Sequence, residues 1–298
     1  ERLITTSEAL DILAAQVTPV ADEVRVPLRA ASGRILAEDV TSSINVPPHA
    51  NSAVDGYAVH FSDLHSDQPT SLPMGGRAAA GHPLGRAAKP GEAIRIFTGA
   101  PMPTGPETVM MQEDCTEQDG IVTIAPGIKS GANCRAAGED VTAGQIVLRR
   151  GLRLRPQEIG MAAAVGRTEL QVYQKISVAV FSTGDEVGEP GTDLSPGKIY
   201  DSNRFISITA LERLGCVVED LGILTDRPEK IGNAIRQAAT NHDLIVTSGG
   251  MSVGEEDHVR KAVQDNGTLH FWRLAIKPGR PVSLGQIRAG DRTAAFVG

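Results

Sequence analysis

Carboxylate residues follow three successive apolar runs in the second half of the sequence. Asp185 and Glu186 come directly after one run, Asp226 follows the next, and Asp257 ends the loop after the third. Carboxylates that converge repel one another unless a cation compensates them, and Mg²⁺ binds one or two carboxylates together with substrate phosphate. This pattern predicts a Mg²⁺ site formed by Glu186, Asp226 and Asp257.

A segment rich in glycine and serine follows the third run. Glycines let the backbone approach a ligand closely, and N–H groups at the start of a helix favour an anion such as phosphate. The alternative is a tight turn between a strand and a helix that binds no ligand, and the segment alone leaves both interpretations open. The residues expected to bind substrate here are Ser248, Gly249, Gly250, Ser252 and Gly254.

Two of these features have other interpretations. Asp226 precedes Pro228, a favourable first residue of a helix, and can instead be the N-cap of that helix. The letters from Gly250 to Gly254 fit the G-x-S-x-G pattern of hydrolases, but the acid and the histidine that a catalytic triad needs follow too close together. A hydrolase is therefore disfavoured. The glycine fingerprint of a dinucleotide-binding fold is absent from the sequence.

Alternating strands and helices must position these residues. Apolar strands are expected at 176–182, 217–224, 244–248, 269–276, 281–287 and 293–297, and helices at 204–214, 228–239 and 258–264. This alternation predicts a parallel, doubly wound sheet, in which ligands bind beyond the carboxyl ends of the strands. Lys277 follows the fourth of these strands. We therefore expect one edge of the sheet to carry carboxylates, a glycine-rich loop and a cation.

The first half of the sequence has a different pattern. A helix opened by a capping box is expected from about Thr5 to Val17, and another helix is expected at 155–165. Between them, short β-type runs alternate with turns rich in proline and glycine. Polar turns in this region contain Asp55, Thr98 and Asp140. Asp55 and the glycine after it can also form a simple hairpin turn, and composition leaves that alternative open.

Composition excludes several classes of partner. The net charge is −7 and aromatic residues make up 3% of the chain, which argues against binding to nucleic acid or to an anionic membrane surface. No apolar run is long enough to span a bilayer, and the first residues lack the apolar core of a secretion signal. The three scattered cysteines are typical of a reducing compartment. We therefore expect a cytoplasmic protein.

A set of ordered motifs is distributed along the whole chain. They are SAVDGYAV at 52–59, IFTGAPMP at 96–103, RAAGED at 135–140, STGDE at 182–186, IYDSN at 199–203, TSGGMSVG at 247–254 and IKPGRP at 276–281. With these motifs at this spacing, the chain resembles the molybdopterin molybdenumtransferase family, MoeA, which includes the E domain of gephyrin. The resemblance extends from the first helix to the last residue.

The resemblance implies a transferase of molybdenum cofactor biosynthesis. Its reaction is the insertion of molybdate into adenylylated molybdopterin, which gives molybdenum cofactor and AMP and requires a divalent cation, usually Mg²⁺. The resemblance also implies a homodimer, in which the α/β domain of one subunit faces the β-rich domain of the other across the active-site cleft. The alternative is a molybdopterin-binding or scaffold module without catalysis.

The resemblance also assigns functional residues. It implies catalytic roles for the carboxylates Asp55, Asp140, Glu186, Asp226 and Asp257. It implies substrate binding by the hydroxyl of Thr98 and by the cations Arg273 and Lys277. Two positions differ from the family's usual pattern. Arg273 stands where Lys is frequent, and Val54, next to Asp55, stands where Met is usual. Arginine binds an oxyanion as a planar fork, whereas lysine acts as a point charge.

The change of pattern near residues 24 and 175, together with the resemblance, predicts an elongated α/β multidomain protein. An α/β molybdopterin-binding-like domain with a doubly wound, mostly parallel sheet is expected at 1–20 and 171–298. A connecting arm is expected at 21–43 and 143–170, and a β-rich domain at 44–142. The C-terminal β domain of the family is expected to be absent from this chain.

Overall fold

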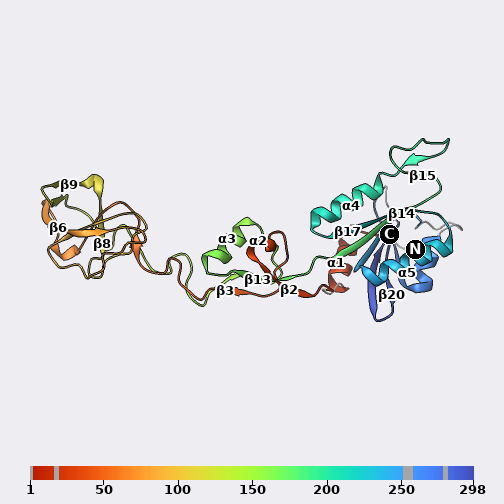
Figure 1. Cartoon of the computed structure of the whole chain (residues 1–298), viewed down its shortest axis with the longest axis horizontal. Helices are drawn as coiled ribbons and strands as arrows, with labels where there is room; N and C mark the ends of the chain where they lie inside the picture. Colours follow the sequence, from red (N-terminus) through yellow and green to blue (C-terminus); the bar gives the residue numbers. More distant parts are fainter. Residues whose placement is uncertain (1–2, 17–19, 251–257, 278–280) are drawn as a thin grey trace. The chain divides into compact units, whose positions relative to one another are not determined.

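The structure of the protein, a computed structural model, describes residues 3–16, 20–250, 258–277 and 281–298 (Figure 1). Contacts between residues divide the chain into two units. The first unit comprises 1–25 and 171–298, and the second comprises 26–170. The predicted division into an α/β domain, a connecting arm and a β-rich domain is finer than this and stays a prediction.

The first unit is built on a seven-stranded sheet with the order β1-β19-β20-β21-β18-β14-β17. The strands are β1 Leu3–Ile4, β14 Ser177–Thr183, β17 Val217–Leu224, β18 Leu244–Ser248, β19 Gly267–Leu274, β20 Pro281–Ala289 and β21 Arg292–Val297. Four neighbouring pairs are parallel, whereas β20 runs antiparallel to both of its neighbours. The connections on either side of β20 are too short for the crossover that parallel strands need. The predicted α/β fold with a mostly parallel sheet is confirmed.

Helices cover both faces of this sheet. They are α4 Asn203–Leu214, α5 Pro228–Asn241 and α6 His258–Asn266, and α1 Thr6–Gln16 follows β1. α4 and α5 lie on opposite faces, as right-handed crossovers require when the chain reverses its direction along the sheet (Figure 1). The apolar residues of α5 and α6 recur at helical spacing and pack on the sheet. This core includes Ile231, Ile235, Val259, Phe181 and Phe296, which are almost fully excluded from solvent.

The elements predicted for this half are found, with ends that differ by a few residues. α5 begins at Pro228, as predicted. α1 begins at Thr6, and the hydroxyl oxygen of Thr5 accepts a hydrogen bond from the backbone N–H of Glu8 at 3.2 Å. The sequence did not predict the two short strands between β14 and α4. These are β15 Val187–Gly188 and β16 Ile199–Tyr200, which pair with each other.

The second unit contains a six-stranded sheet with the order β8-β5-β7-β6-β10-β9. The strands are β5 Gly56–Val59, β6 Thr70–Ala78, β7 Ala93–Ile96, β8 Thr108–Met111, β9 Cys115–Gln118 and β10 Ile121–Ile124. Both faces of the sheet are apolar because buried side chains alternate along its strands. Tyr57 and Val59 belong to one cluster, and Ala58 belongs to the cluster on the other face.

Shorter elements complete the chain. Two-stranded sheets form between β4 Asn51–Ser52 and β11 Cys134–Arg135, between β3 Val40–Thr41 and β12 Ile146–Leu148, and between β2 Glu23–Pro27 and β13 Glu169–Tyr173. The helices are α2 Leu28–Ala31 and α3 Pro156–Ala164, with 3₁₀ turns η1 Phe61–Asp63 and η2 Gln112–Asp114. α3 confirms the helix predicted at 155–165. Within the described part of the chain, every helix is too short or too polar to cross a membrane.

Gly56, at the start of β5, gives a test of how this sheet packs. A Cβ atom at this position would lie 1.8 Å from the carbonyl oxygen of Met110 in β8. We expect Gly56→Ala to push these strands apart and to lower the free energy of unfolding by about 1–3 kcal/mol. Gly160→Ala is the matched control, because a Cβ there meets nothing within 4 Å and the residue lies inside α3. The control should stabilise by about 0.5–1 kcal/mol in urea denaturation. Equal effects of the two substitutions would contradict the expected clash.

Candidate functional site

The carboxyl ends of the predicted strands meet at one edge of the sheet in the first unit. β14 is parallel to β17, with Thr183 opposite Leu224, and parallel to β18, with Ser182 opposite Ser248. β17, the next strand of this sheet along the chain, lies on one side of β14, and β18, which follows β17, lies on the other side. Because the chain reverses its direction across the sheet here, the point between β14 and β18 is a topological switch point. Ligands of open α/β sheets bind at such points.

Gly249 and Gly250 form a tight turn at this switch point. Their φ angles are +100° and +67°, which favour glycine. A Cβ atom at Gly249 would lie 2.5 Å from the carbonyl oxygen of Thr183, and one at Gly250 would lie 2.4 Å from a methyl group of Val259 in α6. Packing alone therefore requires both glycines. Substrate binding by Ser248, Gly249 and Gly250 stays a prediction, and Ser252, Gly254 and Asp257 lie outside the described residues.

Two buried oxygen atoms at this edge lack hydrogen-bond partners. The Oγ1 atom of Thr183 and the Oδ1 atom of Asp226 are both buried, and neither makes a hydrogen bond with the residues that the structure describes. A buried oxygen without a partner is costly, and a bound cation or an ordered ligand removes that cost. A carboxylate in this condition at the end of a parallel strand fits a Mg²⁺ ligand.

The alternative role of Asp226 as a helix N-cap is wrong. The N-cap of α5 is Arg227, and no side chain in the described part of the molecule makes a capping hydrogen bond there. Pro228 at the first helical position has no N–H group to satisfy, which reduces the need for a cap.

The other predicted ligands of this edge are more exposed. Glu186 lies close to the backbone of Gly184, since a Cβ atom at Gly184 would be 2.6 Å from its Oε2 atom. The Lys277 side chain is exposed, and Arg273 lies in β19, opposite Leu3 and Pro281. Among the described residues no three His, Cys, Asp or Glu side chains form a group that could hold a metal ion. Because Asp257 lies outside them, the predicted set of three carboxylates remains a prediction.

The three polar turns of the second unit come together in space. The backbone N–H of Ser52 donates to the carbonyl of Ala100 at 3.0 Å, and Gly99 donates to the carbonyl of Ser52 at 2.8 Å. β4 pairs with β11, which places Asn51 opposite Arg135. The hairpin alternative at Asp55 is wrong, because β4 and β5 on either side of it belong to different sheets.

Asp55 and Thr98 form a polar pair in this cluster. The Oδ1 atom of Asp55 accepts hydrogen bonds from the backbone N–H and from the hydroxyl of Thr98, both at 2.7 Å. These two bonds hold the pKa of the Asp55 carboxyl below its ordinary value of 3.8, the backbone bond contributing most. Asp55 is therefore a fixed, ionised carboxylate at neutral pH.

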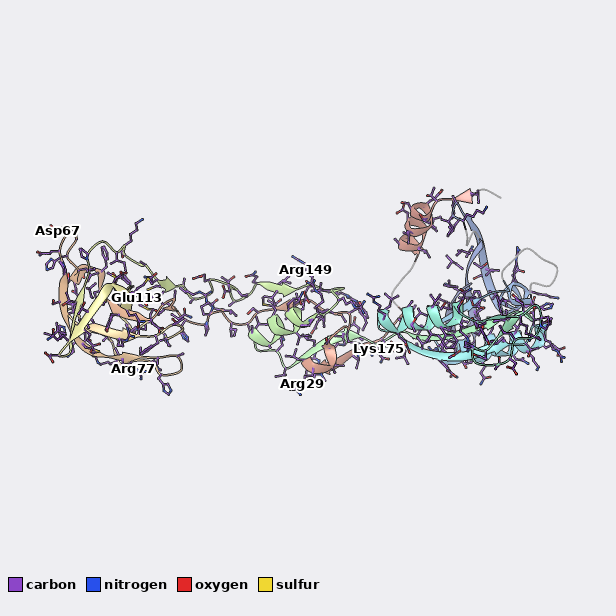
Figure 2. All side chains as sticks on the ribbon, turned by 90° about the horizontal axis from the view of Figure 1, so that it is seen from above. Arg29, Asp67, Arg77, Glu113, Arg149 and Lys175 are labelled. Atoms are coloured by element: carbon purple, nitrogen blue, oxygen red, sulfur yellow. The ribbon has the colours of Figure 1, made fainter. Side chains whose placement is uncertain are left out.

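Thr98 is held in place by its neighbour Phe97. The guanidinium groups of Arg77 and Arg95 lie 4.6 and 4.8 Å from the centroid of the Phe97 ring. Arg95 also lies 4.9 Å from the Tyr57 ring, so the four side chains form one row (Arg77 is labelled in Figure 2). Such cation–π contacts limit the motion of the segment that carries Thr98.

Asp140 pairs with an arginine of its own turn. The Oδ1 atom of Asp140 accepts a hydrogen bond from Arg135 at 2.7 Å, and Arg135 also contacts Glu139 at 3.2 Å. About half of the Asp140 side chain is exposed, so the pair contributes little to stability and stays accessible to a ligand.

The sequence did not single out Arg204, a buried charged residue in the first turn of α4. It contacts Asp201, Glu189 and Asp220. One signal was available, because Arg204 directly follows the IYDSN motif.

Comparisons with known proteins give a consistent result. Residues 4–166 match a family model described as "MoeA N-terminal region (domain I and II)", and residues 179–297 match one described as "Probable molybdopterin binding domain". The chain is similar to the molybdopterin molybdenumtransferase of Haemophilus influenzae, with 43% identity over 87% of this chain and 64% of that protein. It is 37% identical to the protein of the same name from a Nostoc species, over 87% of this chain and 60% of that protein.

A solved structure shows the same fold. The crystal structure of the molybdopterin biosynthesis MoeA protein from Pyrococcus horikoshii superimposes with a TM-score of 0.81 and 29% sequence identity. The alignment covers 99% of this chain and 74% of that chain. The chain thus spans less than two thirds of the length of both curated relatives, 64% and 60%.

The bond between Thr98 and Asp55 can be tested by titration. Because the pKa of Asp55 is depressed, its stabilising contribution is complete above 3.8 and is lost as the pH falls through the folded-state pKa. We expect Thr98→Val to raise the pKa of Asp55 towards the ordinary value, though not fully, since the backbone bond remains. Thr98→Ser keeps the hydroxyl and should leave the titration unchanged. Carboxyl ¹³C NMR measures both, and an unshifted pKa in Thr98→Val would contradict the assignment.

Proposed function

This chain belongs to the MoeA family, and we propose that it takes part in molybdenum cofactor biosynthesis as a molybdopterin molybdenumtransferase. The reaction is the Mg²⁺-dependent insertion of molybdate into adenylylated molybdopterin, with release of AMP. The names of the curated relatives and the molybdopterin-binding family match over 179–297 support the pathway and the transferase class. The buried Oδ1 atom of Asp226, which has no hydrogen-bond partner among the described residues, supports the metal dependence.

Asp226 is the residue on which the metal proposal depends. A carboxylate oxygen that is buried without a partner is unfavourable unless a ligand joins it. Glu186 at the end of β14 and Asp257 after β18 are the proposed further ligands. When bound there, Mg²⁺ compensates the negative charge that develops when a phosphoanhydride is cleaved.

The residues around this edge suit a polyanionic substrate. The turn at Gly249 and Gly250 brings backbone close to the end of β14, and neither of these two residues has a side chain that would block a phosphate group. Lys277 is exposed after β19, and we propose that it and Arg273 neutralise substrate oxygens. Molybdate is itself an oxyanion and has the same requirement for cations.

The cluster in the second unit has a different chemical character. Asp55 stays ionised at neutral pH and accepts two hydrogen bonds from Thr98 through one oxygen atom, so its other oxygen can accept from a donor on the substrate. Asp140 is accessible beside Arg135. We assign Asp55, Thr98 and Asp140 to binding and orienting the substrate.

The protein is also proposed to be a cytoplasmic homodimer. The family resemblance supports the dimer, and three scattered, half-buried cysteines fit a reducing compartment. We expect sedimentation at micromolar concentration to give a particle of twice the 31.4 kDa chain mass. A sedimenting species with the mass of one chain at that concentration would contradict the dimer.

Asp226→Asn tests the metal site with two independent measurements. In the wild type, Mg²⁺ at about 100 times its Kd should stabilise the folded protein by about 2.7 kcal/mol. Asp226→Asn should remove most of this effect, and it should leave the thermal midpoint without Mg²⁺ unchanged or raised, because a buried charge is lost. It should also abolish AMP release from adenylylated molybdopterin after molybdate is added.

Asp265→Asn is the matched control for this experiment. Asp265 is an exposed carboxylate on α6, in the same unit, and its variant should behave like the wild type in both assays. Normal AMP release by Asp226→Asn would count against the metal role. Tight binding of molybdopterin by the wild type without AMP release would favour a binding module instead of a transferase.

A further inference from the structure

Arg204 is a buried cation bound by three carboxylates. It lies in the first turn of α4 and is only 2% exposed. Its Nε atom donates to Asp201 at 3.0 Å, Nη1 donates to Asp220 at 2.6 Å, and Nη2 donates to both oxygens of Glu189 at 2.5 Å. The planar fork of a guanidinium can serve three carboxylates in this way, whereas an ammonium group on a flexible stem cannot do so in the same geometry.

The three carboxylates belong to different segments of the first unit. Glu189 directly follows β15, Asp201 directly follows β16, and Asp220 lies within β17. The hydroxyl of Ser182, the residue before the end of β14, donates to the same Asp201 oxygen that Arg204 binds. One side chain on α4 therefore ties together β14, β17 and the loop between β14 and α4.

The contacts of Arg204 with Glu189 and Asp201 hold the loop that carries Glu186. The carbonyl of Glu186 accepts a hydrogen bond from the N–H of Ile199 at 2.8 Å, and the N–H of Asp201 donates to the carbonyl of Gly188 at 2.9 Å. β15 and β16 thus form the base of the loop. Glu189 directly follows β15, and Asp201 directly follows β16. Because Arg204 binds both residues, it holds the base of the loop against the sheet.

The contact of Arg204 with Asp220 holds a β-bulge in β17. Val180 pairs with Asp220 and Ser182 pairs with Ile223, so that Phe181 alone faces two residues of β17. The Oδ1 atom of Asp220 accepts from Arg204 and also from the N–H of Gly222 at 2.9 Å. Gly222 has a φ of +74°, which favours glycine.

The bulge determines how the end of β17 is presented. An extra residue in one strand shifts every later side chain by one position, and a shift of one position changes the face to which a side chain points. Asp226 follows this bulge by four positions. Without the bulge, Leu224 would lose its register with Thr183, and the chain that continues to Asp226 would leave the strand from a different position.

We propose that Arg204 is a positioning residue for the metal site, and that it sets both Glu186, through Glu189 and Asp201, and Asp226, through Asp220. This inference rests on the proposed Mg²⁺ site. Loss of a group that bonds directly to a metal ligand usually weakens metal affinity about 10- to 100-fold, and because Arg204 acts one residue further out we expect the lower end of this range. Arg204 would therefore affect Mg²⁺ binding although it does not touch the ion.

The experiment measures Mg²⁺ binding by calorimetry and backbone hydrogen exchange at a temperature at which every variant is folded. Arg204→Lys keeps the charge and should raise the Kd for Mg²⁺ about 10-fold or more. It should also speed exchange in segments 184–201 and 220–226. Arg236→Lys is the matched control, because Arg236 lies on α5 and bonds only to asparagine side chains among the described residues. The control should change neither measurement.

Two further variants keep the test decisive if Arg204→Lys fails to fold. Glu189→Ala removes one of the two contacts of Arg204 with the loop and should speed exchange at 184–201. Asp220→Ala removes the bonds of Asp220 to Arg204 and to the N–H of Gly222 and should speed exchange at 220–226. Each should weaken Mg²⁺ binding. Folded variants with a wild-type Kd would overturn the positioning role and leave the metal site intact. A wild-type protein that binds no Mg²⁺ would overturn the metal site and the inference together.

Discussion

Parallel pairing of β14 with both β17 and β18 is the constraint on which the candidate site in the first unit depends. This pairing puts Thr183 opposite Leu224 and Ser182 opposite Ser248, so that Asp226 and the Gly249 turn follow strand ends at the same edge. The turn then packs directly on the Thr183 carbonyl, so there is no space for a side chain at Gly249. The tight packing of the strands and the turn is what restricts this position to glycine.

The sequence predicted this edge well because the relevant rule is local. Each strand could be recognised from its apolar run, and parallel strands put their carboxyl ends on the same side. The antiparallel direction of β20 follows from short connections, which the sequence also contained. Pro228 likewise marked the start of α5 correctly, but the pattern could not tell whether Asp226 or Arg227 is its N-cap. That choice depends on where the Asp226 side chain points, and tertiary packing decides it.

Contacts between distant segments could not be predicted from the pattern of residue types along the sequence. Asp55 and Thr98 are 43 positions apart, and only the fold shows that one accepts two hydrogen bonds from the other. The same holds for Arg204, whose partners Glu189 and Asp220 lie 15 and 16 positions away. A charged residue in the first turn of a helix normally suggests an exposed side chain, and burial of its charge becomes favourable only when carboxylates from other segments surround it.

The carboxylates around Arg204 and the carboxylate of Asp226 differ in their hydrogen-bond partners. Around Arg204, three carboxylates share one cation, and a serine hydroxyl and backbone N–H groups donate further hydrogen bonds to Asp201 and Asp220. A few residues after Asp220, Asp226 has a buried oxygen atom for which the described residues supply no donor. Thr247 and Ser283 of the same unit also have a buried hydroxyl oxygen without a partner among the described residues, but Asp226 is the carboxylate among them, and burial of a carboxylate oxygen without a donor costs more. A ligand at Asp226 would remove that cost, and in the proposed arrangement the cluster around Arg204 holds the oxygen in place until the ligand binds.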